Sequence, residues 1–268
     1  MLLAIDCGNT NTVFALFDGD KKVDQWRCTT DDQRTADEYA VWLAQLLSLK
    51  GFSLGIITDT VIACVVPTAL LGLKSFSERY FKLVPLVVGS SDVDLGIKVL
   101  IDRPQDVGED RLVNAIAAHE KYKGALIVVD FGTATSFDIV DADGNFRGGV
   151  LAPGVNLSAE ALYRAAARLP RVVITKPPSV IGKATVPAMQ SGLYWGYVAM
   201  VEGIVTRIKA EYRKPMKVIA TGGLAALFAD ATPIIQSIDL DITMRGLVLI
   251  HQRNRHSGKA KSKKKGKK

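Results

Sequence analysis

The stretch LLAIDCGNTNTVFALFDGD, residues 2–20, decides the fold. Its first apolar run predicts a buried strand over residues 2–5. A second run, over residues 12–17, predicts a strand that returns beside the first and ends at an Asp-Gly turn signal. Asp6 stands where the first strand ends, a place where a carboxylate is costly to bury unless it has a partner. Asp6 is therefore a candidate functional residue.

The same arrangement occurs again in ALIVVDFGTATSFDIVDADG, residues 125–144. Asp130 stands 124 residues after Asp6, also at the end of an apolar run, and another Asp-Gly pair supplies the turn. An internal repeat of this length indicates a duplicated domain. The sequence therefore predicts an α/β protein of two similar domains with a cleft between them.

The rest of the chain alternates between predicted strands and helices, as is typical of α/β proteins. We expect a first domain over residues 1–122 and a second over residues 123–250. Further strands are predicted at 23–27, 61–66, 84–89, 136–141, 146–150 and 217–220, and helices at 35–50, 67–81, 112–122, 156–169 and 189–212.

Composition narrows the class of protein. The chain has 268 residues, 48% of them hydrophobic, and its apolar runs are shorter than the roughly 20 residues of a membrane helix. We expect a cytoplasmic protein, because its start lacks the basic region and cleavage site of a signal peptide. The three cysteines form no CxxC pair and no metal-ligand spacing with the histidines, so we interpret them as reduced and structural. A reactive Cys7 is the alternative.

The net charge of +7 comes from one end of the chain. Residues 251–268 contain nine Lys or Arg and no acid, so subtracting these charges from +7 leaves −2 for the rest. A run such as SGKAKSKKKGKK cannot form a core, and we predict a disordered, solvated tail. It is interpreted as a solubilising extension. The alternative is binding of nucleic acid or another anionic surface.

The two repeated loops suggest phosphate binding. Gly8 and Gly132 allow backbone N–H groups to approach phosphate oxygens closely. Beside bound polyphosphate, Asp6 and Asp130 would repel the ligand unless a hard metal ion lay between them. The alternative is that each aspartate only caps a turn. Side-chain donors in the loops are Asn9, Thr10, Asn11, Thr133 and Thr135.

A third glycine element, Thr221-Gly222-Gly223, joins a predicted strand to a predicted helix. Glycines in such a turn let the backbone lie against a nucleotide. The chain contains neither G-x-G-x-x-G nor G-x-x-x-x-G-K-[ST], which excludes Rossmann and P-loop interpretations.

Seven motifs follow one another along the chain: DCGNTN, ACVVP, PQDVGEDRLVNA, DFGTATSFD, GGVLAPG, ATVPAMQSGLYWGYVAMVEGI and ATGG. This ordered set resembles one family, the type III pantothenate kinases, within the superfamily of acetate kinase, sugar kinases, Hsp70 and actin. The resemblance implies two actin-like (ribonuclease H-like) domains, each a mixed sheet with flanking helices. It implies a homodimer that phosphorylates pantothenate with ATP to 4'-phosphopantothenate, the first step of coenzyme A biosynthesis. Mg²⁺ and K⁺ or NH₄⁺ are the implied ions.

The resemblance also implies roles for individual residues. Asp110 matches the catalytic base, Asp130 the ligand of the monovalent cation, and Asp6 lies near Mg²⁺ through water. The matching ATP-binding residues are Asp6, Gly8, Asn9, Thr10, Asn11, Thr133, Gly222 and Gly223. The matching pantothenate-binding residues are Gly108, Glu109, Asp110, Arg111 and Thr185.

The residues themselves leave alternatives open for two of these roles. Asp110 directly precedes a predicted helix, so it also suits an N-cap. Arg111 suits a bidentate contact with the carboxylate of a substrate, but also a surface position. Many relatives have a small residue in place of Glu109 and a tyrosine in place of Ile101, so the substrate pocket is expected to differ.

Two other functions fit parts of the sequence. One is a kinase of another small hydroxy acid, because the phosphate loops do not specify the acceptor. The other is a non-catalytic transcription accessory factor, with the basic tail contributing to binding. The retention of Asp6, Asp110 and Asp130 favours an enzyme, since a protein that only binds would not require all three carboxylates.

Overall fold

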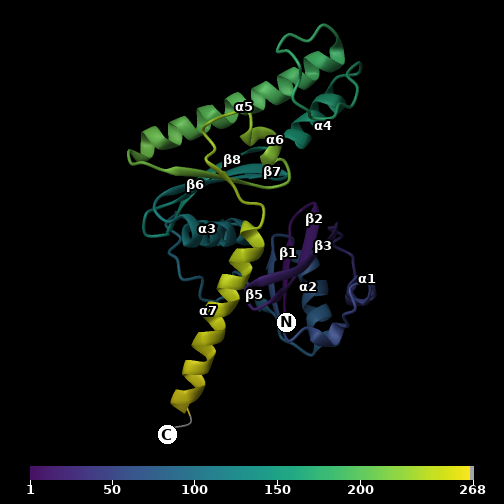
Figure 1. The fold of residues 1–268 in the computed structure, drawn as a ribbon, viewed down its shortest axis with the longest axis vertical. Helices are drawn as coiled ribbons and strands as arrows, with labels where there is room; N and C mark the ends of the chain where they lie inside the picture. The colour runs from purple at the N-terminus through teal and green to yellow at the C-terminus, as the bar shows by residue number, and fades with distance from the viewer. Residues whose placement is uncertain (266–268) are drawn as a thin grey trace. The chain divides into compact units, whose positions relative to one another are not determined.

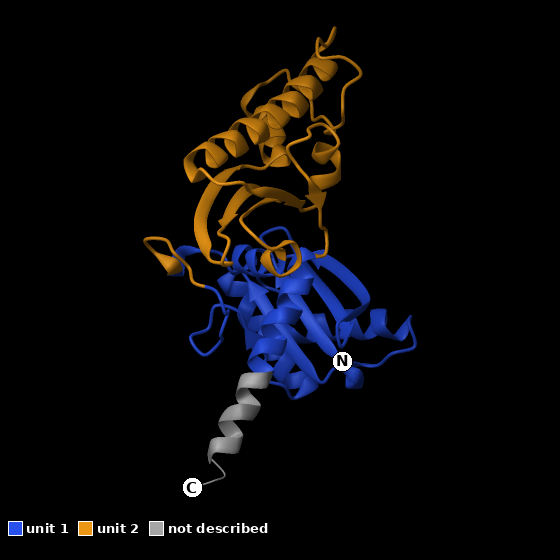
Figure 2. Ribbon diagram, turned by 60° about the vertical axis from the view of Figure 1, so that its left-hand side comes forward, with its two compact units in different colours: residues 1–97, 105–117, 242–268 blue, residues 98–104, 118–241 orange. Residues whose placement is uncertain are grey.

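The computed structural model describes residues 1–265, and the side chains of residues 1–255. The chain divides into two compact units (Figure 2). Unit 1 contains residues 1–97, 105–117 and those from 242 onward, and unit 2 contains residues 98–104 and 118–241. The division at 117/118 lies close to the predicted domain boundary. The C-terminal helix differs from the prediction, because it groups with unit 1 and not with the second domain.

Unit 1 is built on a five-stranded mixed sheet in the order β3-β2-β1-β4-β5 (Figure 1). The strands β1, β2 and β3 are antiparallel, whereas β4 pairs parallel with β1 and β5 parallel with β4. Alternation along each strand sends successive side chains to opposite faces. The strands are β1 (Leu2–Cys7), β2 (Asn11–Asp18), β3 (Lys21–Thr29), β4 (Asp59–Cys64) and β5 (Leu86–Val87).

Helices cover both faces of this sheet. The helices α1 (Ala36–Ser48) and α2 (Pro67–Phe76) pack on the face that carries Leu3, Ile5 and Cys7. The opposite face, which carries Leu2, Ala4 and Asp6, is covered by α3 (Glu109–Tyr122) and α7 (Ile242–Lys265), through the side chains Val113, Ile116, Leu247 and Val248. Thr35 begins α1 with a capping box that includes Glu38.

Unit 2 repeats the strand order of unit 1, as β8-β7-β6-β9-β10. Its first three strands are antiparallel, and β9 and β10 are added in parallel, as β4 and β5 are in unit 1. The prediction of two duplicated α/β domains is therefore confirmed. The strands are β6 (Leu126–Phe131), β7 (Ala134–Val140), β8 (Phe146–Pro153), β9 (Lys217–Thr221) and β10 (Ser237–Ile238).

One helical layer packs on the second sheet. The long helix α5 (Thr185–Tyr212) contributes Tyr194, Tyr197 and Val201 to the core, and α6 (Ala225–Ala229) contributes Phe228 (Figure 1). The rings of Phe131 and Phe228 stack with centroids 5.3 Å apart. The remaining elements are α4 (Val155–Ala165) in unit 2 and the short turns η1 (Leu54–Ile56), η2 (Ser77–Phe81) and η3 (Pro104–Asp106).

The predicted disordered tail does not begin at residue 251. The helix α7 continues to Lys265, and residues 251–255 belong to unit 1 and contact its other segments. His251 is buried beside Asp59, with 3.6 Å between imidazole and carboxylate, and the guanidinium of Arg253 donates to the carbonyl of Leu95. The side chains of residues 256–268 lie outside the described residues. Within the described part of the chain, no helix is long and apolar enough to cross a membrane.

Candidate functional site

The carboxyl ends of two parallel strands meet at one edge of the unit 1 sheet. Asp6 of β1 pairs in register with Ala63 of β4, and both strands end at the next residue. The chain then turns tightly, because the N–H of Gly8 donates to the carbonyl of Asn11 over 3.0 Å. The exposed side chains of this turn, Asn9, Thr10 and Asn11, therefore stand at the edge where the two strands end.

The start of α3 reaches the same edge. A Cβ atom at Gly108 would lie 2.8 Å from Oδ1 of Asp110 and 3.4 Å from Cγ1 of Val65, the residue that follows β4. A side chain at this position would force the carboxylate of Asp110 to move. Since α3 packs on the sheet face that carries Asp6, the structure brings Asp6, Gly108 and Asp110 to one edge of unit 1.

Asp110 does not cap the helix in the manner of an N-cap residue. It lies within the first turn of α3, and its Oδ1 accepts a hydrogen bond of 2.8 Å from the N–H of the adjacent Arg111. An N-cap side chain accepts from a residue two or three positions ahead. Burial raises the pKa of Asp110, and the N–H and charge of Arg111 oppose this shift. The carboxylate is therefore more basic than an exposed aspartate.

Glu109 does not point into open solvent. It is half-buried, and its Oε1 lies 3.0 Å from where a Cβ at Gly89 would stand. Gly89 has a φ of +89°, which also favours glycine. Burial raises the pKa of Glu109, and the charge of Asp110 adds to the shift. The carboxylate of Glu109 is thus placed against the loop that follows β5.

Unit 2 has a matching edge. Asp130 is half-buried between the buried residues Val129 and Phe131 of β6, and it pairs with Thr221 of β9. The next residue, Gly222, has a φ of +90°, and a Cβ there would lie 2.5 Å from Oδ1 of Asp130. The ATGG motif is therefore packed directly against the carboxylate of Asp130.

The second phosphate loop is held by a further glycine. The N–H of Gly132 donates to the carbonyl of Ala134 over 3.1 Å, and the N–H of Gly154 donates to the carbonyl of Thr133 over 3.1 Å. A Cβ at Gly154 would overlap the carbonyl oxygens of this loop. Spacing alone did not reveal the role of Gly154, although it stands in the GGVLAPG motif.

One predicted donor of the second loop is wrong. Thr135 is buried, and its hydroxyl is hydrogen-bonded to the hydroxyl of Tyr197. The cause is a difference in loop length. Asp6 pairs with Val13, seven residues on, whereas Asp130 pairs with Ser136, six residues on. Thr135 therefore corresponds to the buried Thr12, not to the exposed Asn11.

The remaining predicted site residues lie apart along the chain. Thr185 is exposed and begins α5 in unit 2, whereas Gly108–Arg111 belong to unit 1. A cavity of ≈ 490 Å³ opens beside the first phosphate loop. It is lined by Asn9, Thr29, Thr30, Asp31, Asp32, Arg34 and Val66.

Each edge offers one aspartate, Asp6 or Asp130, and this fits a cation that takes most of its ligands from water or from the substrate. No cluster of three or more His, Cys, Asp or Glu side chains suited to a metal ion occurs among the described residues. Mg²⁺ commonly binds through one or two carboxylates together with waters and phosphate oxygens. A single Asp6 at a phosphate loop is consistent with that mode of binding.

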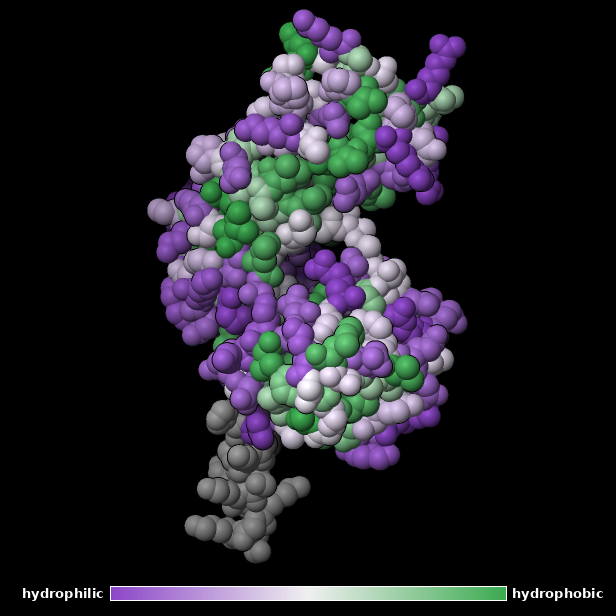
Figure 3. All heavy atoms as spheres, turned by 45° about the vertical axis from the view of Figure 1, so that its right-hand side comes forward, coloured by the Kyte–Doolittle hydropathy of each residue, from purple (hydrophilic) through white to green (hydrophobic). Residues whose placement is uncertain are grey.

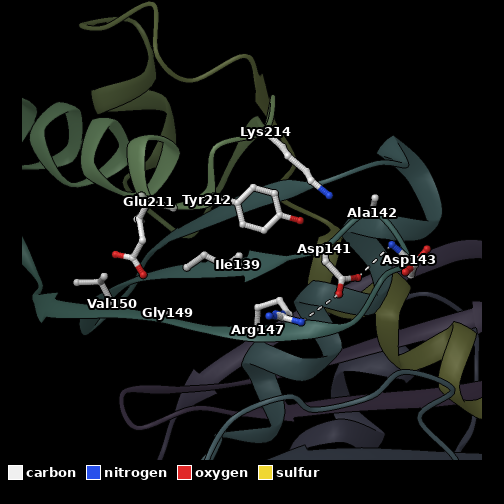
Figure 4. A pocket seen from close by; sticks show the side chains of 11 residues that line it. Ile139, Asp141, Ala142, Asp143, Arg147, Gly149, Val150, Glu211, Tyr212 and Lys214 are labelled. Atoms are coloured by element: carbon white, nitrogen blue, oxygen red, sulfur yellow. Dashed lines mark hydrogen bonds and ion pairs between the residues drawn. The ribbon is translucent and has the colours of Figure 1, made fainter.

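Another cavity lies elsewhere in unit 2. It has a volume of ≈ 750 Å³ and is formed by the β7–β8 hairpin and the end of α5 (Figure 4). Val140, at the end of β7, pairs with Leu126 at the start of β6. This cavity is thus at the opposite edge of the sheet from Asp130, and we do not assign the phosphate site to it. Its polar lining residues are Asp141, Asp143, Arg147, Glu211, Tyr212 and Lys214.

Two sheets of identical order, each with a glycine loop and an aspartate at its carboxyl edge, define the actin-like fold class of two duplicated α/β domains. A solved structure with this fold is that of a proposed 2-dehydro-3-deoxygalactonokinase from Sinorhizobium meliloti. It has a TM-score of 0.58 and 14% identity, with 94% of this chain and 99% of that chain covered. A proposed Baf family transcriptional activator from Campylobacter jejuni has a TM-score of 0.58 and 19% identity, with 95% and 99% covered. Both matches show the fold alone.

Sequence comparison gives the family. The model for type III pantothenate kinase matches residues 2–207. The type III pantothenate kinase of Paramagnetospirillum magneticum is 61% identical over 254 residues, which cover 95% of this chain and 98% of the relative. The chain belongs to the type III pantothenate kinase family. The predicted activity, phosphorylation of pantothenate by ATP in coenzyme A biosynthesis, is confirmed. ATP and a divalent metal ion are the cofactors that this activity requires.

Neighbouring glycines provide a matched test of the ATGG turn. Gly222→Ala should greatly reduce turnover, because its positive φ and its contact with Asp130 leave no room for a methyl group. Gly223→Ala should have a much smaller effect, since no atom lies within 4 Å of the added Cβ and the backbone is unstrained. Steady-state kinetics of both variants measure the turnover, and thermal melting measures their stability. Equal losses of turnover would contradict the assignment.

Proposed function

We propose that Asp110 is the general base that accepts the proton of the pantothenate hydroxyl during phosphoryl transfer. The observation that supports this role is the carboxylate of Asp110, held over Gly108 at the edge where the first phosphate loop begins. Phosphoryl transfer has a loose transition state, so orientation of the hydroxyl matters as much as basicity. A raised pKa makes this carboxylate a better proton acceptor than an exposed one.

Roles for the other predicted residues form part of the same proposal. The phosphate loops of both units, with Gly222 and Gly223, take part in ATP binding. Asp6 holds Mg²⁺ through water, and the cation neutralises the phosphate charge that the carboxylate would otherwise repel. Arg111 pairs with the pantothenate carboxylate, for which a guanidinium is the suited partner, and Gly108, Glu109 and Thr185 line the substrate site.

Asp110→Asn should lower turnover strongly while leaving ATP affinity nearly intact. In the wild type, turnover should fall as the pH drops through the raised pKa of Asp110. This fall should therefore occur at a higher pH than for an ordinary aspartate, whose pKa is about 3.9. The pH profile of kcat and a nucleotide-binding titration measure both effects.

The same variant has a second, independent readout in stability. Because the folded-state pKa is raised, the folded protein binds the proton more tightly, and stability falls as the pH rises through the raised value. Removing this charge should therefore increase the melting temperature at pH 7. The exposed Asp102→Asn is the control and should change neither quantity. Unchanged turnover in Asp110→Asn would exclude Asp110 as the base.

We propose that Asp130 binds the monovalent cation, K⁺ or NH₄⁺. Its carboxylate is held against Gly222, and oxygen ligands of this kind suit a hard cation. Asp130→Asn keeps the shape of the side chain and removes its charge, so activation by K⁺ over Na⁺ should be lost. Turnover measured against K⁺ concentration tests this, and retained activation would rule out Asp130 as the ligand.

We propose that the enzyme is a homodimer that buries an apolar part of unit 2. Residues 151–186 expose a concentration of large apolar side chains, and apolar surface reaches the outside of unit 2 in Figure 3. Such surface is typical of an interface. The exposed residues are Leu151, Leu157, Leu162, Tyr163, Val173, Val180, Ile181 and Val186.

Ile181→Asp should dissociate the dimer. The side chain of Ile181 is 79% exposed, so a charge there disturbs no core but would be buried without a partner in an interface. Val41→Asp, at a side chain of α1 that is 73% exposed, is the matched control. Sedimentation velocity distinguishes monomer from dimer. A dimer that persists in Ile181→Asp would place the interface elsewhere.

We propose a cytoplasmic enzyme whose basic residues beyond Arg255 are not needed for catalysis. All three cysteines are free, as is usual in a reducing compartment. Removal of residues 256–268 spares the contacts of residues 251–255, so turnover should stay unchanged while adsorption to RNA weakens. Steady-state kinetics measure the turnover, and a titration with RNA at several salt concentrations measures the adsorption. Lost turnover would contradict this role, and recovery of the protein in the membrane fraction would contradict the location.

A further inference from the structure

All three cysteines of the chain lie in one row across the unit 1 sheet. Cys7 of β1 pairs in register with Cys64 of β4 on one side and with Thr12 of β2 on the other. Thr12 in turn pairs with Cys28 of β3. In-register neighbours point to the same face of a sheet, and all three sulfurs belong to the core beneath α1 and α2. Sequence spacing could not reveal this row.

Only one pair in the row is close enough for a disulfide. The side chains of Cys7 and Cys64 are in-register neighbours and interact with each other across the paired strands. Neighbouring strands lie about 4.8 Å apart, and disulfides join Cα atoms about 4.4–6.8 Å apart. Cys28 is two strands away from Cys7, about 10 Å by the same spacing, which is beyond that range.

The pair lies directly beneath the first phosphate loop. Cys7 stands between Asp6 and Gly8, and its carbonyl accepts a hydrogen bond of 3.0 Å from the N–H of Val65. The S–H of Cys64 donates to the carbonyl of Val66 over 3.1 Å, and Val66 lines the cavity beside the loop. A bond between the two sulfurs would remove the S–H donor and draw the ends of β1 and β4 together.

A chain of hydroxyl groups connects the sulfur to the loop. The hydroxyl of Thr12 lies 3.5 Å from Sγ of Cys7 and 2.9 Å from the hydroxyl of Thr30. The hydroxyl of Thr30 donates to the carbonyl of Gly8 over 2.7 Å. Loss of the Cys7 thiol therefore changes a hydrogen-bond network that ends on the glycine of the phosphate loop.

We propose that Cys7 and Cys64 form a reversible disulfide that switches off ATP binding at the first phosphate loop. With a peroxide as oxidant, each thiol gives up one proton and one electron. The S–S bond forms, the O–O bond of hydrogen peroxide breaks, and two molecules of water are released. A dithiol reverses the reaction and is itself oxidised to a disulfide. The inference rests on the proposed role of the loop in binding ATP.

The test compares oxidised and reduced wild-type protein. After treatment with hydrogen peroxide and alkylation, a tryptic digest without reductant is analysed by mass spectrometry. The three cysteines fall in separate tryptic peptides, residues 1–21, 28–34 and 51–74. We expect a link between peptides 1–21 and 51–74, with loss of ATP binding and turnover that dithiothreitol restores.

Two kinds of variant control the result. Cys64→Ala should resist oxidation, and Cys64→Ser, which keeps a donor for Val66, is the second choice if the alanine variant is unstable. Cys28→Ala should remain as sensitive as the wild type. Activity loss without the 1–21 to 51–74 link, or equal loss in Cys64→Ala, would overturn the proposal. If reduced wild-type protein failed to bind ATP, the role of the loop itself would be wrong, which is a separate outcome.

Discussion

Parallel pairing of the central strands is the constraint on which both candidate sites depend. In each unit the first strand pairs antiparallel with its hairpin partner and parallel with a strand that arrives much later in the chain. The parallel pair ends at one edge, so loops from distant parts of the sequence meet there. Close approach of these loops requires glycine at Gly222 beside Asp130 and favours it at Gly108 beside Asp110.

The charged residues of these sites lower the free energy of unfolding. The carboxylate of Asp110 is partly buried and its pKa is raised, so the ion that catalysis uses costs more free energy in the folded chain than in the unfolded chain. The neighbouring Glu109 is a second carboxyl group whose pKa is raised by burial. Local costs of this kind are typical of functional sites and are offset by the apolar cores on the sheets.

Structure formed by residues close together in the sequence was predictable, whereas contacts between distant segments of the chain were not. Alternating hydrophobicity and Asp-Gly turns determine a hairpin within a few residues, so the repeated openings around Asp6 and Asp130 were predictable. The boundary at residue 251 was drawn from charge alone, but apolar residues such as Leu247 and Ile250 carry α7 onto the unit 1 sheet. Thr135 was misassigned because a loop shorter by one residue sends its side chain to the opposite face. The row of cysteines depends on strand order, which no spacing encodes.

The most direct test of the account is ADP release by the reduced, full-length protein with ATP and Mg²⁺, measured with and without pantothenate, together with detection of 4'-phosphopantothenate. The account predicts that release depends on pantothenate and that one phosphorylated product forms for each ADP. Release that ignores pantothenate, or no release in its presence, would contradict the assignment of the GEDR segment at residues 108–111 as the substrate site.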